Sequence, residues 1–290
     1  MKKRFLAVLA IGTIGLTIFS CSNDETVPED KKTEVNKKII KANFPVTDVY
    51  SRDSESYLYN TDGTINKIIV GDSYEEYTVS YSDQLITMNL TKHNFSGWIE
   101  YLEVTNIHLS EGNVYKVITN TKRIASTKTL TTKDSLSFSY NNEYLSSIIQ
   151  NTKEDNEPYR QRKKVEFFIE NGNIVKSITN FFTQDVETLY TYDNNEYILD
   201  GEFMYEAPLF NNIGRYYILI KDNLGKKNKN NIISMVNNYN EATKPNSYMK
   251  NLHYTRKVDE HGRLNEIVIS GEGYNQQPIT ISNAKTELKY

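Results

Sequence analysis

A hairpin unit that recurs along the chain constrains the fold more than any other feature of the sequence. Its clearest copy follows an aromatic segment and runs from Asn60 through Asp62-Gly63 to Ile65 and Ile68. Asp and Asn tolerate left-handed backbone and Gly favours it, so such a segment reverses the chain tightly. The other copies, from clear to loose, begin at Asp259, Glu111, Asn142, Asn171 and Ser82. Repeated hairpins predict an antiparallel β-meander.

The apolar pair after each turn is spaced by three residues, as in Ile65 and Ile68 or Leu264 and Ile267. Side chains of a regular strand share a face every second residue, so this spacing does not fit one face. Two alternatives follow. Either the first apolar residue plugs the corner of the turn, or a β-bulge intervenes.

Period-two alternation surrounds the turns and indicates sheet with one packed face and one wet face. Tyr77, Val79 and Tyr81 alternate with Thr78, Ser80 and Ser82, and the same pattern recurs at 136–140, 165–170 and 252–258. The 22 tyrosines favour strands as well. We therefore predict an all-β fold, a meander curled into an open or closed barrel-like sheet. Helix is expected only as short stretches around Asn231–Asn238.

The chain begins with a basic segment, Met1-Lys2-Lys3-Arg4, which is followed by the apolar residues 5–19 and by Ile18-Phe19-Ser20-Cys21, which holds the only cysteine. This layout resembles a bacterial lipoprotein signal peptide with its lipobox. The apolar run of about fifteen residues falls short of the roughly 20 that a bilayer span needs. A plain secreted protein with one stray cysteine is the alternative. We expect lipidation at Cys21, which holds the protein on the membrane.

Three segments follow from this interpretation. Residues 1–20 are the signal peptide, 21–38 the lipidated cysteine and a disordered tether, and 39–290 a single β-meander domain. The tether has a mean span of about 23 Å and a ceiling of about 56 Å. Acidic residues directly after Cys21 resemble the export signal of surface lipoproteins, which favours the cell surface over the periplasmic face of the outer membrane.

The turn units are similar to the YD (RHS-like) repeat. Together with the lipobox, the chain resembles uncharacterised Bacteroidetes lipoproteins, including the DUF4595 group, which is described as having a porin-like fold. This resemblance implies a curled sheet or barrel, with no assigned activity and no catalytic residues to carry over. The chain departs from the repeat between Ala207 and Asn240, where no clean turn unit is present.

The net charge of the chain and the motifs that it lacks argue against several classes of function. Loss of residues 1–20 leaves 31 basic and 37 acidic residues, a net charge of −6, which argues against nucleic acid as a partner. The four histidines lack neighbours at zinc-ligand spacing, and no hydrolase or phosphate-loop motif is found. We expect no cofactor, no metal and no catalytic residue. Ser270-Gly271-Glu272-Gly273-Tyr274 is interpreted as a turn.

Aromatic residues beside polar loops are the remaining candidates for a binding site. They are Trp98, Tyr239, Tyr248 and Tyr254. Flat rings with a polar tip stack on sugars or peptide side chains, although the same residues also form ordinary cross-strand pairs. The leading hypothesis is a lipid-anchored, non-catalytic envelope protein that binds a glycan or a protein. A scaffolding lipoprotein of an outer-membrane complex is the alternative, and a glycoside-type hydrolase comes third.

Overall fold

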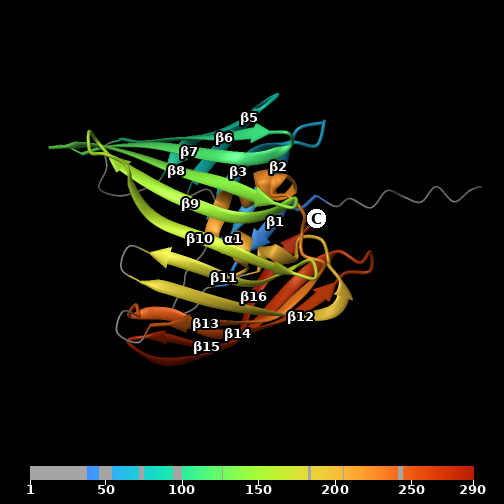
Figure 1. Ribbon diagram of the computed structural model, residues 1–290. Helices are drawn as coiled ribbons and strands as arrows, with labels where there is room; N and C mark the ends of the chain where they lie inside the picture. The colour runs from blue at the N-terminus through green and yellow to red at the C-terminus, as the bar shows by residue number, and fades with distance from the viewer. Residues whose placement is uncertain are drawn as a thin grey trace, which may run out of the picture. The chain divides into compact units, whose positions relative to one another are not determined.

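A closed antiparallel barrel forms the folded part of the chain (Figure 1). The computed structural model describes residues 38–45, 54–71, 75–93, 100–125, 127–181, 184–204, 206–240 and 244–290. The strands are β1 Lys41–Asn43, β2 Glu55–Tyr59, β3 Ile65–Val70, β4 Glu75–Ser82, β5 Leu85–His93, β6 Glu100–Ser110, β7 Asn113–Ile124, β8 Thr129–Asn141, β9 Tyr144–Glu154, β10 Arg160–Glu170, β11 Asn173–Phe181, β12 Asp185–Glu196, β13 Asn230–Tyr239, β14 Ser247–Val258, β15 Leu264–Asn275 and β16 Gln277–Lys289. The helical segments are η1 Gly201–Phe203, α1 Pro208–Ile213, η2 Gly214–Tyr216, α2 Tyr217–Ile220 and η3 Lys221–Asn223.

Each strand pairs with the next one along the chain, and β1 pairs with β16 to close the ring. Lys41 lies opposite Lys289 at the closure. The predicted all-β meander is therefore confirmed, and of the two predicted forms the closed barrel is the one observed. Closure gives every described strand a partner on both sides, which removes the exposed edges of an open sheet.

Of the two alternatives that the three-residue spacing left open, the structure shows the β-bulge. Ile65 and Ile68 are both buried, at 5% and 1% exposure, because the register with β2 shifts between them. Tyr59 pairs with Ile65 and Leu58 with Lys67, so the residue after Ile65 is an extra one that bulges out. The same shift follows the turns of β6–β7, β8–β9, β10–β11 and β14–β15. The bulge thus returns the second apolar residue to the inside.

The inward residues of the strands form one apolar core with the segment between β12 and β13. Phe203 and Ile220 in this segment are 0% exposed, and Phe210 is 2% exposed and stacks on Phe44 at 5.4 Å between ring centroids. The described residues between 197 and 229, which we call the insert, therefore pack into the barrel, where Figure 1 shows α1. The insert lies where the sequence lacked turn units, and it holds the helices. The prediction of helix around Asn231–Asn238 is wrong, because strand β13 spans these residues.

The outer face of the sheet carries charged pairs beside exposed apolar residues such as Leu58 and Phe168. Lys164 pairs with Glu166 at 2.9 Å, and Lys67 on β3 pairs with Glu76 on β4 at 3.1 Å. Transmembrane barrels instead face lipid with a continuous apolar band about 25 Å tall. The charged pairs suit this outer face to water. Among the described residues, no helix is long and apolar enough to cross a bilayer.

Several predictions concern residues outside the described part of the chain. Lipidation at Cys21, the signal peptide 1–20, all of the tether 21–38 except residue 38, and any role of Trp98 belong to this group. They stay predictions.

Candidate functional site

Three tyrosine–glutamate pairs line the inside of the barrel on alternate strands. Residues two apart on a strand share a face, and in each pair the tyrosine hydroxyl donates to the carboxylate. The pairs are Tyr57 with Glu55 at 2.8 Å, Tyr77 with Glu75 at 2.7 Å, and Tyr101 with Glu103 at 2.9 Å. They place three carboxylates inside one wall of the barrel.

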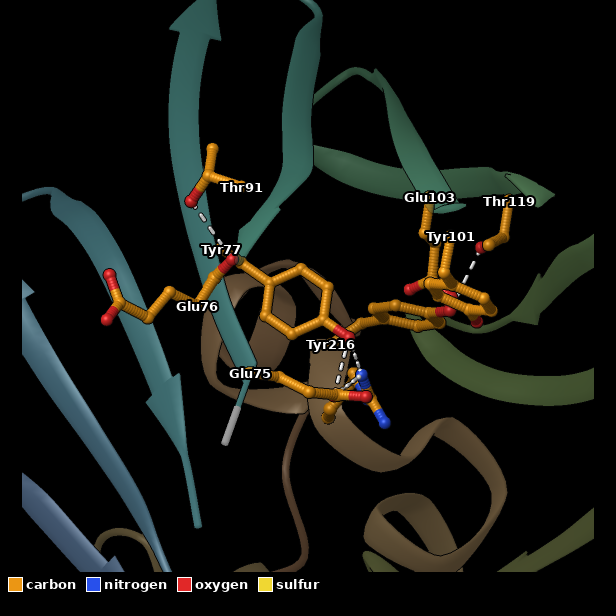
Figure 2. A network of polar contacts seen from close by, with 9 residues as sticks. Glu75, Glu76, Tyr77, Thr91, Tyr101, Glu103, Thr119 and Tyr216 are labelled. Carbon is orange, nitrogen blue, oxygen red and sulfur yellow. Dashed lines mark hydrogen bonds and ion pairs between the residues drawn. The ribbon is translucent and has the colours of Figure 1, made fainter. Parts of the chain in front are cut away.

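The insert reaches this wall through Arg215. Figure 2 shows Glu75 and Tyr77 of the wall together with Tyr216 of the insert. Its Nη1 donates to Glu75 Oε2 at 2.8 Å and also contacts the hydroxyl of Tyr77. The guanidinium lies 5.2 Å from the centre of the Tyr77 ring, within the range of a cation–π interaction. Because Glu75 is nearly buried, the arginine neutralises a charge that would otherwise be costly inside the barrel.

A second chain of contacts runs from the insert to β7 and β6. The hydroxyls of Tyr216 and Thr119 are 2.9 Å apart, and Thr119 lies 3.0 Å from Thr105, which is 0% exposed. On the other side of the barrel, Lys163 of β10 donates to Asn212 of α1 at 3.1 Å. The insert is therefore held by strands far apart around the ring.

Electrostatics fix the protonation states in this network. Burial raises the pKa of Tyr77 well above its usual range, and burial followed by the charge of Glu103 raises the pKa of Tyr101 to about 12. Burial works to lower the pKa of Arg215, but Tyr77, Glu75 and Glu103 outweigh it and raise that pKa above its usual range. The tyrosines are thus neutral donors and the arginine a fixed cation at neutral pH, an arrangement that holds the insert in place.

A group of tyrosines lies at the ends of β13, β14 and β15 and forms the second candidate site. Tyr239 and Tyr248 have ring centroids 4.5 Å apart, and Tyr248 stacks on Tyr274 at 5.4 Å with an interplanar angle of 21°. The Lys244 ammonium lies 5.9 Å from the rings of both Tyr248 and Tyr274. Burial, with Glu206 and Tyr248 next, raises the pKa of Tyr239 above its usual range.

Tyr248 and Tyr274 border a depression of about 400 Å³, which we call the tyrosine pocket. Lys250 and Glu272 form an ion pair at 3.3 Å in its lining. The pocket therefore offers stacked rings beside a cation and hydrogen-bonding groups. Its lining residues are Lys244, Tyr248, Lys250, Glu272, Gly273, Tyr274, Pro278, Ile279 and Thr280.

The structure brings together two of the predicted aromatic residues and separates a third. The Tyr239 ring contacts Tyr248, and of the two only Tyr248 lines the tyrosine pocket. Tyr254 is 3% exposed within the core, where burial raises its pKa well above its usual range. Tyr254 is therefore not accessible to a ligand at the surface.

Sequence reasoning missed Tyr274 because it treated 270–274 as a turn. That interpretation is wrong, since β15 runs through Asn275 and pairs Tyr274 with Tyr248. Gly271 adopts φ +152° where β15 passes close to the carbonyl of Asn251. The glycines thus mark a close backbone approach inside a strand.

No family model matches the chain. A search of curated proteins also found no match. Among solved structures, the chain is similar to a porin-like protein from Bacteroides uniformis, with a TM-score of 0.56 and 15% sequence identity. The alignment covers 87% of this chain and 97% of that one. At this identity the likeness establishes a porin-like fold, in agreement with the fold that the family resemblance implied.

Proposed function

We propose that the chain is a lipid-anchored, non-catalytic saccharide-binding protein of the outer membrane, displayed at the cell surface. The tyrosine pocket is the observation that carries the binding role. Stacked rings with polar rims suit the apolar face of a sugar, while Lys250 and Glu272 supply partners for its hydroxyls.

The barrel's interior supports binding at the surface over passage through a channel. The insert packs its aromatic residues into the core and is latched to β4, β7 and β10. Wide membrane barrels that conduct leave the lumen filled with water. The closed sheet also lacks the unpaired edge among its described strands that would favour the scaffolding alternative.

A saccharide-binding assay with matched tyrosine variants tests the proposal. The purified domain is screened against immobilised neutral oligosaccharides, and affinities for the best binder are measured by calorimetry. Tyr274→Ala removes one stacking ring, worth about 1.4 kcal/mol or tenfold in Kd. Tyr115→Ala on β7 is the control, because this tyrosine is 46% exposed and lies outside the pocket.

A tenfold weaker Kd for Tyr274→Ala with an unchanged Kd for Tyr115→Ala supports the proposal. Equal affinities for both variants and the parent would overturn the assignment of the pocket, and a screen without any saccharide binder would overturn the binding role.

A further inference from the structure

Three lysines gather around a second depression, on the outer face of β6 to β9. Its volume is about 500 Å³. Lys122, Lys133 and Lys153 come from three adjacent strands, β7, β8 and β9. We call this place the lysine pocket.

The lysines are placed close together by the register of the strands. Lys133 lies directly opposite Lys153, and Asn120, two residues before Lys122 on the same face, lies opposite Lys133. Directly opposed side chains on antiparallel strands have Cβ atoms about 5 Å apart, and like charges in that position are destabilising. The fold therefore accepts a local repulsion between Lys133 and Lys153.

These lysines differ from other lysines of the outer face, whose charges are paired with glutamates. None of the three forms an ion pair with a residue in the described part of the chain, whereas Lys164 and Lys176 pair with glutamates at 2.9 Å and 3.7 Å. The acidic residue in the lining is Asp155, and its Oδ1 accepts both the N–H and the hydroxyl of Thr131, at 2.9 Å and 2.8 Å. The pocket thus keeps a net positive charge in an acidic protein.

Apolar and neutral polar groups complete the lining. Leu102 and Tyr159 leave 44% and 48% of their surfaces exposed at this place. Asn120 and Thr131 add an amide and a hydroxyl beside them. An exposed ring, hydrogen-bonding groups and uncompensated ammonium groups together match a sugar that carries an anionic substituent.

We propose that the lysine pocket binds an acidic saccharide, one that bears carboxylate or sulfate groups. The ammonium groups contact the anions, Asn120 and Thr131 contact hydroxyls, and the Tyr159 ring packs on the C–H face of the sugar. A depression of this volume falls in the usual range for small-ligand sites, roughly 300–1,000 Å³. The site lies on different strands from the tyrosine pocket and goes beyond the function proposed for it.

Calorimetry with defined oligosaccharides tests this proposal on the purified full-length protein. The probes are oligogalacturonate, a sulfated oligosaccharide and a neutral oligomaltose of similar length, each at 20 and 200 mM NaCl. The test variant is Lys122→Gln/Lys133→Gln/Lys153→Gln. Its matched control, Lys164→Gln/Lys176→Gln/Lys285→Gln, removes the same charge from ion-paired lysines of the same outer face.

We expect one acidic probe or both to bind, with the Kd at least tenfold weaker in the test variant and within twofold of the parent in the control. Binding should weaken at the higher salt, since exposed charges are screened. Tyr274→Ala should leave it unchanged, which separates this proposal from the function proposed for the tyrosine pocket. Thermal melting confirms that each variant is folded.

Three outcomes would overturn the proposal. An equal loss in the test and control triples would assign the binding to overall charge. If oligomaltose binds equally well, or if neither acidic probe binds, an acidic saccharide is excluded as the specific ligand of the lysine pocket. Sedimentation with phosphatidylglycerol vesicles that depends on the same three lysines, without saccharide binding, would assign the surface to a lipid instead.

Discussion

Glu202 makes the stability of the barrel depend on pH near neutrality. This carboxyl lies in η1 with 3% of the residue exposed, and Asn228 Nδ2 donates to its Oε1 at 2.6 Å. Burial raises its pKa to about 7, although the hydrogen bond from Asn228 and the charges of Arg256 and Lys227 act in the opposite direction. The ordinary value for such a carboxyl is 4.5.

The sign and size of the effect follow from this shift. Between about pH 4.5 and pH 7 the folded state holds a proton on Glu202 that the unfolded state has lost, so the free energy of unfolding falls as pH rises. One pKa unit corresponds to about 1.4 kcal/mol, so the shift makes the folded state about 3 kcal/mol less stable above pH 7 than below pH 4.5.

Urea unfolding of Glu202→Gln measured from pH 4.5 to pH 8.5 checks this expectation. The glutamine keeps an oxygen for Asn228 and does not titrate, so the difference in free energy of unfolding between parent and variant should change by about 3 kcal/mol across the range. Ser139→Ala on the outer face removes no titratable group, so it is the control and should leave the pH dependence unchanged. Parallel curves for the parent and Glu202→Gln would refute the reasoning.

Three further predictions concern the ion pair of Arg215 with Glu75, the close approach of Gly271 to Asn251, and lipid anchoring at Cys21. Arg215→Met should lower the free energy of unfolding, measured in urea, by about 2 kcal/mol, because it leaves Glu75 without its arginine inside the barrel. Adding Glu75→Gln should restore part of this loss, and an unchanged unfolding midpoint for Arg215→Met would contradict the role of the ion pair. Gly271→Ala should cost about 3 kcal/mol in thermal melts, since the methyl group overlaps the carbonyl oxygen of Asn251. Cys21→Ala should move the full-length protein from the membrane to the soluble fraction on immunoblots, and retention in the membrane would exclude lipid anchoring.

The strands were predictable because their information is local. Alternation and turn residues lie within a few positions of one another, and β2, β4, β7 and β14 follow them closely. The sequence also contains the information for the tyrosine–glutamate pairs, since Glu75 and Tyr77 are two residues apart in a strand and so share a face. This pair was not predicted from the sequence, because the alternation identified in this strand began at Tyr77.

The rest depends on contacts between distant residues. Arg215 and Glu75 are 140 positions apart, and nothing in the sequence around Arg215 indicates that its segment enters a barrel. The rings of Tyr248 and Tyr274 meet because a bulge in β14 sets the register with β15. Period-two patterns do not reveal such shifts, so Tyr248 is the one lining residue of the tyrosine pocket that was predicted from the sequence.

The recurring bulge leads to a test of how the hairpin unit works. In β7, Val114 pairs with Leu109 and Lys116 with His108, so Tyr115 is the extra residue, and it is 46% exposed. Deleting Tyr115 should restore regular alternation with Val114 and Val117 still inside, at a cost of about 1 kcal/mol or less. Deleting Ile118 from the regular part of the same strand reverses the faces of one side of β7 and should prevent folding. Thermal melts of both variants decide the matter, and equal damage from the two deletions would show that Tyr115 is part of the regular pairing.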